Sequence, residues 1–132
     1  MFIVKNSEQI MLMKQAGKIT AEALLVAREM IRPGVSTKEI DQKVRRFIES
    51  SGAVPSFLGY GGFPASACVS INEMVVHGIP DDVTILKDGD IVKLDIGACY
   101  EGYHGDSAWS YIVGTPKSEK DVKLLRWTEE AL

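Results

Sequence analysis

The sequence has 132 residues, of which 45% are hydrophobic and 25% charged, and its formal net charge is −3. This length and composition predict one globular domain spanning residues 1–132 and exclude a disordered or fibrous class. The acidic balance, with no run of Lys and Arg longer than a pair, argues against a nucleic-acid partner. No apolar run approaches the roughly 20 residues of a membrane-spanning helix, and the first ten residues lack a signal-peptide pattern. These features together predict a soluble, cytoplasmic protein with no membrane partner.

Two long helices are predicted in the first part of the chain. Asn6 is followed three residues later by Gln9, a capping-box pattern, and apolar positions then recur at helical spacing to about Ile31. Ser36 begins a second capping box, which predicts a helix over residues 37–51. Their charged faces are expected to be solvated, so both helices are interpreted as scaffold.

The chain then becomes rich in glycine, aromatic and β-branched residues. Residues 67–71 and 74–76 are predicted to be short strands, and residues 58–64 an aromatic loop. Two interpretations fit that loop: a pocket wall whose glycines let the backbone approach a ligand, and a surface loop whose rings fold onto the core. His77 is expected to project from the end of a strand, either as a structural residue or as a hydrogen-bond donor or proton shuttle.

A β-hairpin is predicted for residues 91–113. The strand-like runs 91–100 and 103–113 flank Glu101 and Gly102, which form a short polar link typical of a hairpin. A two-residue loop would pair Gly97 with Asp106 and place Asp95 diagonally from Asp106 on one face. A three-residue loop would place the two acids on opposite faces, unless a bulge near Gly105 restored the register.

Two like charges in apolar surroundings are unfavourable unless a proton or a cation lies between them. Asp95 and Asp106 therefore indicate either a site for divalent metal ions or, in the simpler interpretation, acids that face solvent or cap a turn. His104 shares the predicted face of Asp106 and competes for the role of metal ligand. After the hairpin, Ser118 begins a third predicted helix, which has no sequence signal for its end.

Several spaced motifs resemble type I methionine aminopeptidase of the bacterial kind. They are RPGVST at residues 32–37, LGYGGFP at 58–64, SINE at 70–73, HGIP at 77–80, KDGDIV at 87–92, Asp95, and HGD at 104–106. The similarity runs from the first helix to the last residue. It implies an α+β fold that is half of the pita-bread (creatinase/aminopeptidase) fold, with an antiparallel sheet packed against two long helices.

The resemblance also implies roles for individual residues. Asp95 and Asp106 would be metal ligands, and His77 would be catalytic and would contact the scissile amide. The methionine side chain would lie in a pocket formed by Phe57, Tyr60, Phe63 and Cys68, next to His77; many relatives carry Cys in place of Phe57. His104 matches no metal ligand of the family.

The implied function is removal of the initiator methionine from nascent proteins with small second residues, through attack by a metal-bound hydroxide on the first peptide bond. The implied cofactors are two divalent ions of Mn, Fe, Co or Zn, and the partner is the N-terminal peptide of the nascent protein. In the family, a His and two Glu from a second half complete the five metal ligands. The chain is therefore expected to be an N-terminal half that by itself binds metal weakly or not at all and is nearly inactive.

Two alternatives remain at this point. One is a proline-specific dipeptidase of the same fold, although such enzymes usually carry a large additional N-terminal domain. The other is a non-catalytic module that binds peptide or self-associates through its exposed sheet face.

Overall fold

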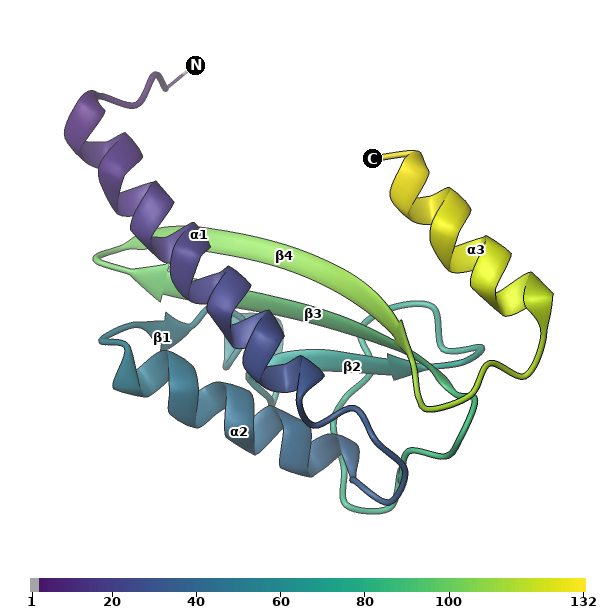
Figure 1. Ribbon diagram of the computed structural model, residues 1–132. Coiled ribbons are helices and arrows are strands. Elements are labelled where there is room, and N and C mark those ends of the chain that lie inside the picture. The colour runs from purple at the N-terminus through teal and green to yellow at the C-terminus, as the bar shows by residue number, and fades with distance from the viewer. Residues whose placement is uncertain (1–2) are drawn as a thin grey trace.

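A computed structural model describes residues 3–132 as an antiparallel sheet with two helices on one face and a third helix at one end (Figure 1). The elements in chain order are α1 (Ser7–Arg28), α2 (Thr37–Ser50), β1 (Val54–Pro55), the 3₁₀ turn η1 (Tyr60–Gly62), β2 (Ala67–Ile71), β3 (Ile91–Tyr100), β4 (Tyr103–Ile112) and α3 (Glu119–Glu130). No helix within the described residues combines the length and apolarity needed to span a bilayer.

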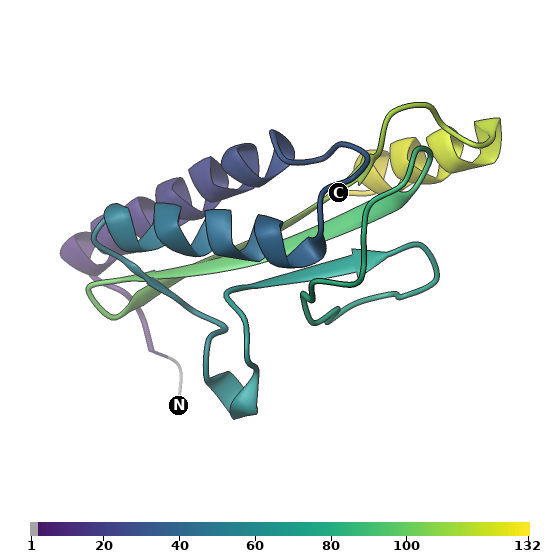
Figure 2. The same cartoon turned by 90° about the horizontal axis from the view of Figure 1, so that it is seen from below.

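Strand β3 is the centre of the sheet. It pairs with β4 along its whole length, and on its other side it pairs with β2 and then with β1. Helix α1 packs across β3 and β4, while α2 packs against α1, β1 and β2. Figure 2 shows both helices on the same side of the sheet, so the opposite side is free to form a site.

The two scaffold helices are confirmed, and both predicted capping boxes are formed. The side chain of Asn6 accepts from the Gln9 amide at 2.9 Å, and that of Ser36 accepts from the Glu39 amide at 3.1 Å. Helix α1 ends at Arg28, before the predicted end near Ile31. The apolar periodicity continues past the helix because Met30 and Ile31 still pack against the core from the following turn.

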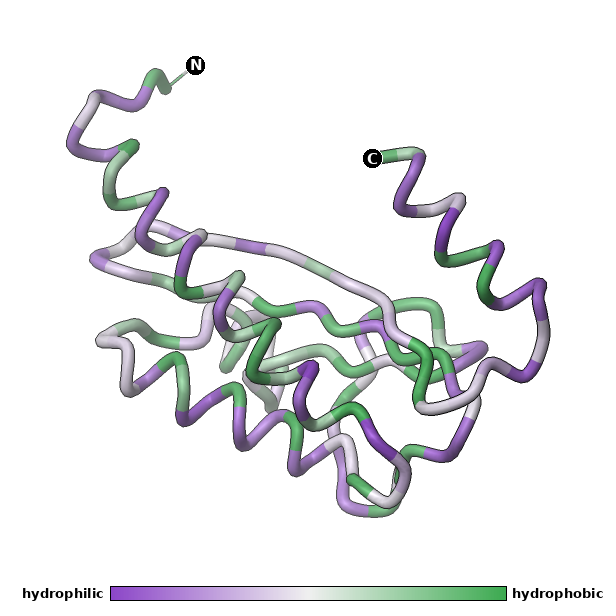
Figure 3. The backbone as a smooth tube through the Cα atoms, in the orientation of Figure 1, coloured by the Kyte–Doolittle hydropathy of each residue, from purple (hydrophilic) through white to green (hydrophobic). Residues whose placement is uncertain are grey.

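The core lies between the helices and the sheet. Ile19, Ile40, Val44, Leu94 and Ile96 are among its members, and each is at most 2% exposed. Figure 3 shows hydrophobic residues along the faces of α1 and α2 and along β2 and β3. Helix α3 differs from the other two helices because none of its residues is buried.

Gly105 has a packing role that the sequence did not predict. A Cβ atom at this position would lie 2.6 Å from the backbone nitrogen of Gly17 and 2.7 Å from the carbonyl of Ala16. The absence of a side chain at Gly105 therefore lets the backbone of α1 cross β4 at close range. No bulge occurs here, because β3 and β4 pair residue for residue through Ala98 and Gly105.

The predicted strand over residues 74–76 is wrong. This segment is part of an irregular loop, and Val75 and Val76 are 75% and 60% exposed. The backbone turns out of the sheet at Asn72, where φ is 50°. Without a neighbouring strand to pair with, the β propensity of these valines is not realised.

Candidate active site

The hairpin brings Asp95 and Asp106 onto one face of the sheet, as predicted for a two-residue loop. Glu101 and Gly102 form the turn with φ values of 49° and 81°, the left-handed conformation that tight hairpins require. Gly97 pairs with Asp106, and Tyr100 pairs with Tyr103. Asp95 is consequently two residues along β3 from the partner of Asp106, at the diagonal position.

Asp95 is in an electrostatically unfavourable environment. Burial raises the pKa of its carboxyl group, and the neighbouring carboxylate of Asp106 raises it further. Its Oδ1 atom is buried and has no hydrogen-bond partner among the described residues. A buried oxygen with free lone pairs beside a second carboxylate is the donor set that a hard divalent cation prefers, so the two residues fit a metal ion.

All seven predicted site residues line one pocket of about 560 Å³. Its lining consists of Phe57, Tyr60, Gly61, Gly62, Phe63, Pro64, Cys68, His77, Ile79, Asp95 and Asp106. The sequence left two interpretations of the loop over residues 58–64, and the structure supports the pocket wall.

Phe57 and Cys68 form the inner wall of this pocket. A Cβ atom on Gly97 would lie 2.8 Å from the Phe57 ring, so the glycine lets the ring pack directly on β3. Cys68 pairs with Asp95 across the sheet and has a free, buried thiol. Burial, together with the charges of Asp95 and Asp106, raises the pKa of the Cys68 thiol to about 11. The thiol is therefore protonated at neutral pH and serves as a neutral surface rather than a nucleophile.

His77 lies in a loop with a φ of 59°, and not at the end of a strand as predicted. The residue that follows it is tied to β2, because the Gly78 amide donates to Ser70 Oγ at 3.0 Å and the Gly78 carbonyl accepts from the Val69 amide at 3.0 Å. The imidazole lies close enough to Asp95 for its charge to oppose the rise in that residue's pKa. A non-glycine residue held in this conformation is typical of a functional site.

His104 lies on the predicted face of β4, but its ring contacts Ser56 and not the two carboxylates. Its Nδ1 atom is 2.9 Å from Ser56 Oγ, and the residue does not line the pocket that contains Asp106. No group of three or more His, Cys, Asp or Glu side chains in residues 3–132 is placed to hold a metal ion. The described residues thus offer two carboxylates and no third ligand.

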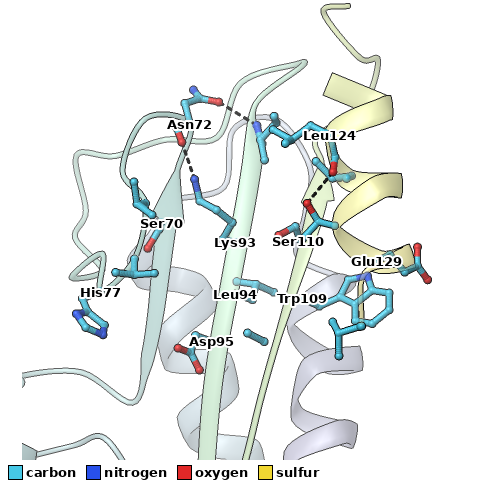
Figure 4. Close-up of a pocket in the computed structure, with 17 residues that line it drawn as sticks. Ser70, Asn72, His77, Lys93, Leu94, Asp95, Trp109, Ser110, Leu124 and Glu129 are labelled. Carbon is cyan, nitrogen blue, oxygen red and sulfur yellow. Dashed lines mark hydrogen bonds between the residues drawn. The ribbon is translucent and has the colours of Figure 1, made fainter. Parts of the chain in front are cut away.

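A second pocket, of about 530 Å³, lies between the sheet and α3 (Figure 4). It shares His77 and Asp95 with the first pocket and is otherwise lined by residues for which the sequence predicted no role in a site, among them Asn72, Lys93 and Trp109. In Figure 4 the His77 ring and the Asp95 carboxylate lie on the same side of β3. The two residues therefore stand at the junction of the two pockets.

The fold and the pair of carboxylates are compatible with a metal-dependent peptidase, and comparison with known proteins identifies the family. The chain belongs to metallopeptidase family M24, whose sequence profile matches residues 11–132. It is 53% identical to methionine aminopeptidase 1 of Bacillus subtilis over 132 residues, which is 100% of this chain and 52% of that protein. The chain spans about half the length of the curated relatives it matches.

Solved structures give the same result. The chain superposes on the methionine aminopeptidase of Thermotoga maritima with a TM-score of 0.96 and 42% identity, over 100% of this chain and 53% of the other. For the prolidase of Pyrococcus furiosus the TM-score is 0.85 and the identity 28%, over 98% and 36%. The resemblance to methionine aminopeptidase and the α+β half of the pita-bread fold are confirmed.

Proposed function

We propose that the chain is one half of the catalytic domain of a methionine aminopeptidase that removes the initiator methionine from nascent proteins with small second residues. The proposal rests on one observation above all. The buried Oδ1 of Asp95, which no described residue hydrogen-bonds, and the carboxylate of Asp106 line the same pocket as an apolar wall suited to a methionine side chain.

In this proposal each part of the pocket has its own task. Asp95 and Asp106 would hold divalent metal ions, which supply an activated water and polarise the carbonyl group of the first residue. Phe57, Phe63 and the neutral Cys68 thiol would surround the methionine side chain and exclude water from it. His77 would donate a hydrogen bond to the scissile amide and stabilise the charge that develops on its oxygen.

The proline-specific dipeptidase is less well supported. The prolidase of Pyrococcus furiosus matches this chain with a lower TM-score and a lower sequence identity than the methionine aminopeptidase of Thermotoga maritima does. This chain also covers a smaller share of the prolidase, 36% against 53%. The aromatic, apolar lining of the 560 Å³ pocket also favours a flexible apolar side chain as the bound group.

Calorimetric titration with Mn²⁺ tests the metal site. Two carboxylates offer few of the roughly six oxygen ligands that hard divalent ions take, so we expect weak binding by this chain and little peptidase activity. Asp106→Asn should abolish that binding, since it removes one of two charges. Asp82→Asn, which makes the same charge change at an exposed loop residue, should leave it unchanged. Equal binding by the wild type and Asp106→Asn would contradict the proposal, as would efficient methionine release by the chain alone.

The exposed apolar surface on β4 and α3 favours a second proposal, self-association of this chain. Trp109, Leu124 and Trp127 are 44%, 56% and 64% exposed, and a large exposed apolar patch is typical of a protein–protein contact. We expect sedimentation velocity to show a dimer that dissociates on dilution, and that Trp127→Lys shifts it to monomer. A monomer at every concentration tested would refute self-association.

A further inference from the structure

The loop that carries His77 is anchored to the sheet at both ends. It leaves β2 at Asn72 and returns at Gly78. Asn72 and His77 both adopt positive φ values, 50° and 59°. Residues other than glycine keep this conformation only where surrounding contacts impose it, so the contacts at the two ends determine where His77 lies.

The returning end is held by Ser70. This side chain is 2% exposed, and its Oγ accepts from the Gly78 amide at 3.0 Å. The Val69 amide donates to the Gly78 carbonyl at 3.0 Å, so Gly78 is hydrogen-bonded to β2 through both its N–H and its C=O groups. A Cβ atom on Gly78 would overlap the Val69 carbonyl oxygen. The backbone next to His77 therefore lies directly against the strand.

The outgoing end is held by Asn72, which uses all four of its polar groups. Its backbone amide donates to the Ile91 carbonyl and its Oδ1 accepts from the Ile91 amide, both at 2.9 Å. Its Nδ2 donates to Asp90 Oδ1 at 3.0 Å, and its carbonyl accepts from Lys93 Nζ at 2.6 Å (Figure 4). Asn72 is thus fixed to the first residues of β3, the strand that carries Asp95.

The His77 imidazole has no comparable support of its own. The only imidazole hydrogen bond within residues 3–132 belongs to His104. The position of the His77 ring is therefore set by its backbone, through Ser70 on β2 and Asn72 on β3.

We propose that Ser70 and Asn72 are positioning residues that clamp the two ends of the loop over residues 72–78 and so hold the His77 ring beside Asp95. Neither residue touches the reacting atoms; both act through His77. This inference rests on the proposed function for its meaning, but the placement of the ring is measurable without metal or substrate.

Nuclear magnetic resonance of the metal-free chain tests the clamp directly, since His77 and His104 are the only two histidines. Ser70→Ala removes the acceptor of the Gly78 amide, so we expect that amide to exchange about tenfold faster or more. We also expect the nuclear Overhauser effects between the His77 ring and the pocket side chains to be lost, while those between β3 and β4 persist.

Asn72→Gly tests the other end without adding backbone strain, because glycine accepts a positive φ. The same loss of His77 contacts is expected. Two matched controls separate positioning from general destabilisation. Ser66→Ala removes a buried hydroxyl that has no hydrogen-bond partner in residues 3–132, and Glu101→Gly changes another residue with a φ near 50°. Both should leave the His77 contacts intact.

Unchanged His77 contacts in Ser70→Ala and Asn72→Gly would overturn the proposal, and so would loss of the sheet signals in both. If only one of these two variants unfolds, the His77 contacts in the other variant test the proposal. Addition of Mn²⁺ tests the proposed function separately, since paramagnetic broadening of the His77 and His104 rings requires metal near Asp106. Equal broadening in the wild type and Asp106→Asn would refute the metal site, while the metal-free contacts still decide the clamp.

Discussion

Asp95→Asn is expected to make the metal-free chain more stable and at the same time to abolish Mn²⁺ binding. The wild-type carboxylate has a buried oxygen without a hydrogen-bond partner in the described part of the chain, and it faces a second carboxylate. An asparagine has nearly the same shape, carries no charge and can donate a hydrogen bond to Asp106. Removing a buried, uncompensated charge stabilises a fold by about 1–3 kcal/mol. Residues selected for binding often lower stability in this way.

Urea denaturation near neutral pH, with a chelator present, measures the stability, and titration with Mn²⁺ measures the binding. Asp82→Asn is the matched control, because it changes the net charge equally at an exposed position. We expect that control to alter neither quantity appreciably. If Asp95→Asn were less stable than the wild type, the carboxylate would have a stabilising partner, and the argument for a metal site would lose its main support.

The hairpin was predictable because its signals are local. The Glu101-Gly102 pair specifies a tight turn, and once the loop length is two, the period of the strands places Asp95 and Asp106 on one face. The capping boxes were predictable for the same reason, since each involves residues three apart. In these places the sequence within a few residues determines the structure.

The predictions that failed concern segments whose structure depends on residues far away in the sequence. Nothing within residues 74–76 shows that a partner strand is missing, so their β-branched side chains suggested a strand that does not form. The contact between Asn72 and Asp90 spans 18 residues and was not predicted. The pocket wall came from the resemblance rather than from periodicity, because an aromatic, glycine-rich loop fits a pocket and a surface equally well.

His104 illustrates a different limit. Alternation along the strand placed it on the same face as Asp106, and that placement is confirmed. Its partner, however, is Ser56, which lies 48 residues away and enters from the segment after β1. A shared face therefore identifies which residues are able to meet, and only the tertiary fold decides which of them do.

Asp90 links the two ends of the hairpin to the rest of the molecule. The residue is 4% exposed; its Oδ1 accepts from Asn72 Nδ2 and from Lys117 Nζ, both at 3.0 Å, and its Oδ2 accepts from the Lys87 amide at 2.9 Å. Burial alone would raise the pKa of Asp90, but the hydrogen bonds from Asn72, Lys117 and Lys87 outweigh it and lower the pKa below 3.8. The folded state therefore prefers the ionised form.

Asp90→Asn is expected to destabilise the fold by about 2–4 kcal/mol near neutral pH, because the amide cannot accept from all three donors and leaves at least one of them unsatisfied. A lowered pKa means that the unfolded chain binds the proton more readily, so the stability due to Asp90 is present above the unfolded value and is lost as the pH falls through the lower folded value. The difference between the wild type and Asp90→Asn in urea denaturation should accordingly be largest near pH 7 and shrink as the pH falls through the acidic range below the ordinary aspartate pKa. A difference that stayed constant over this range would show that the ionised carboxylate is not what stabilises this corner, and that the shape of the side chain alone holds Asn72 and Lys117 in place.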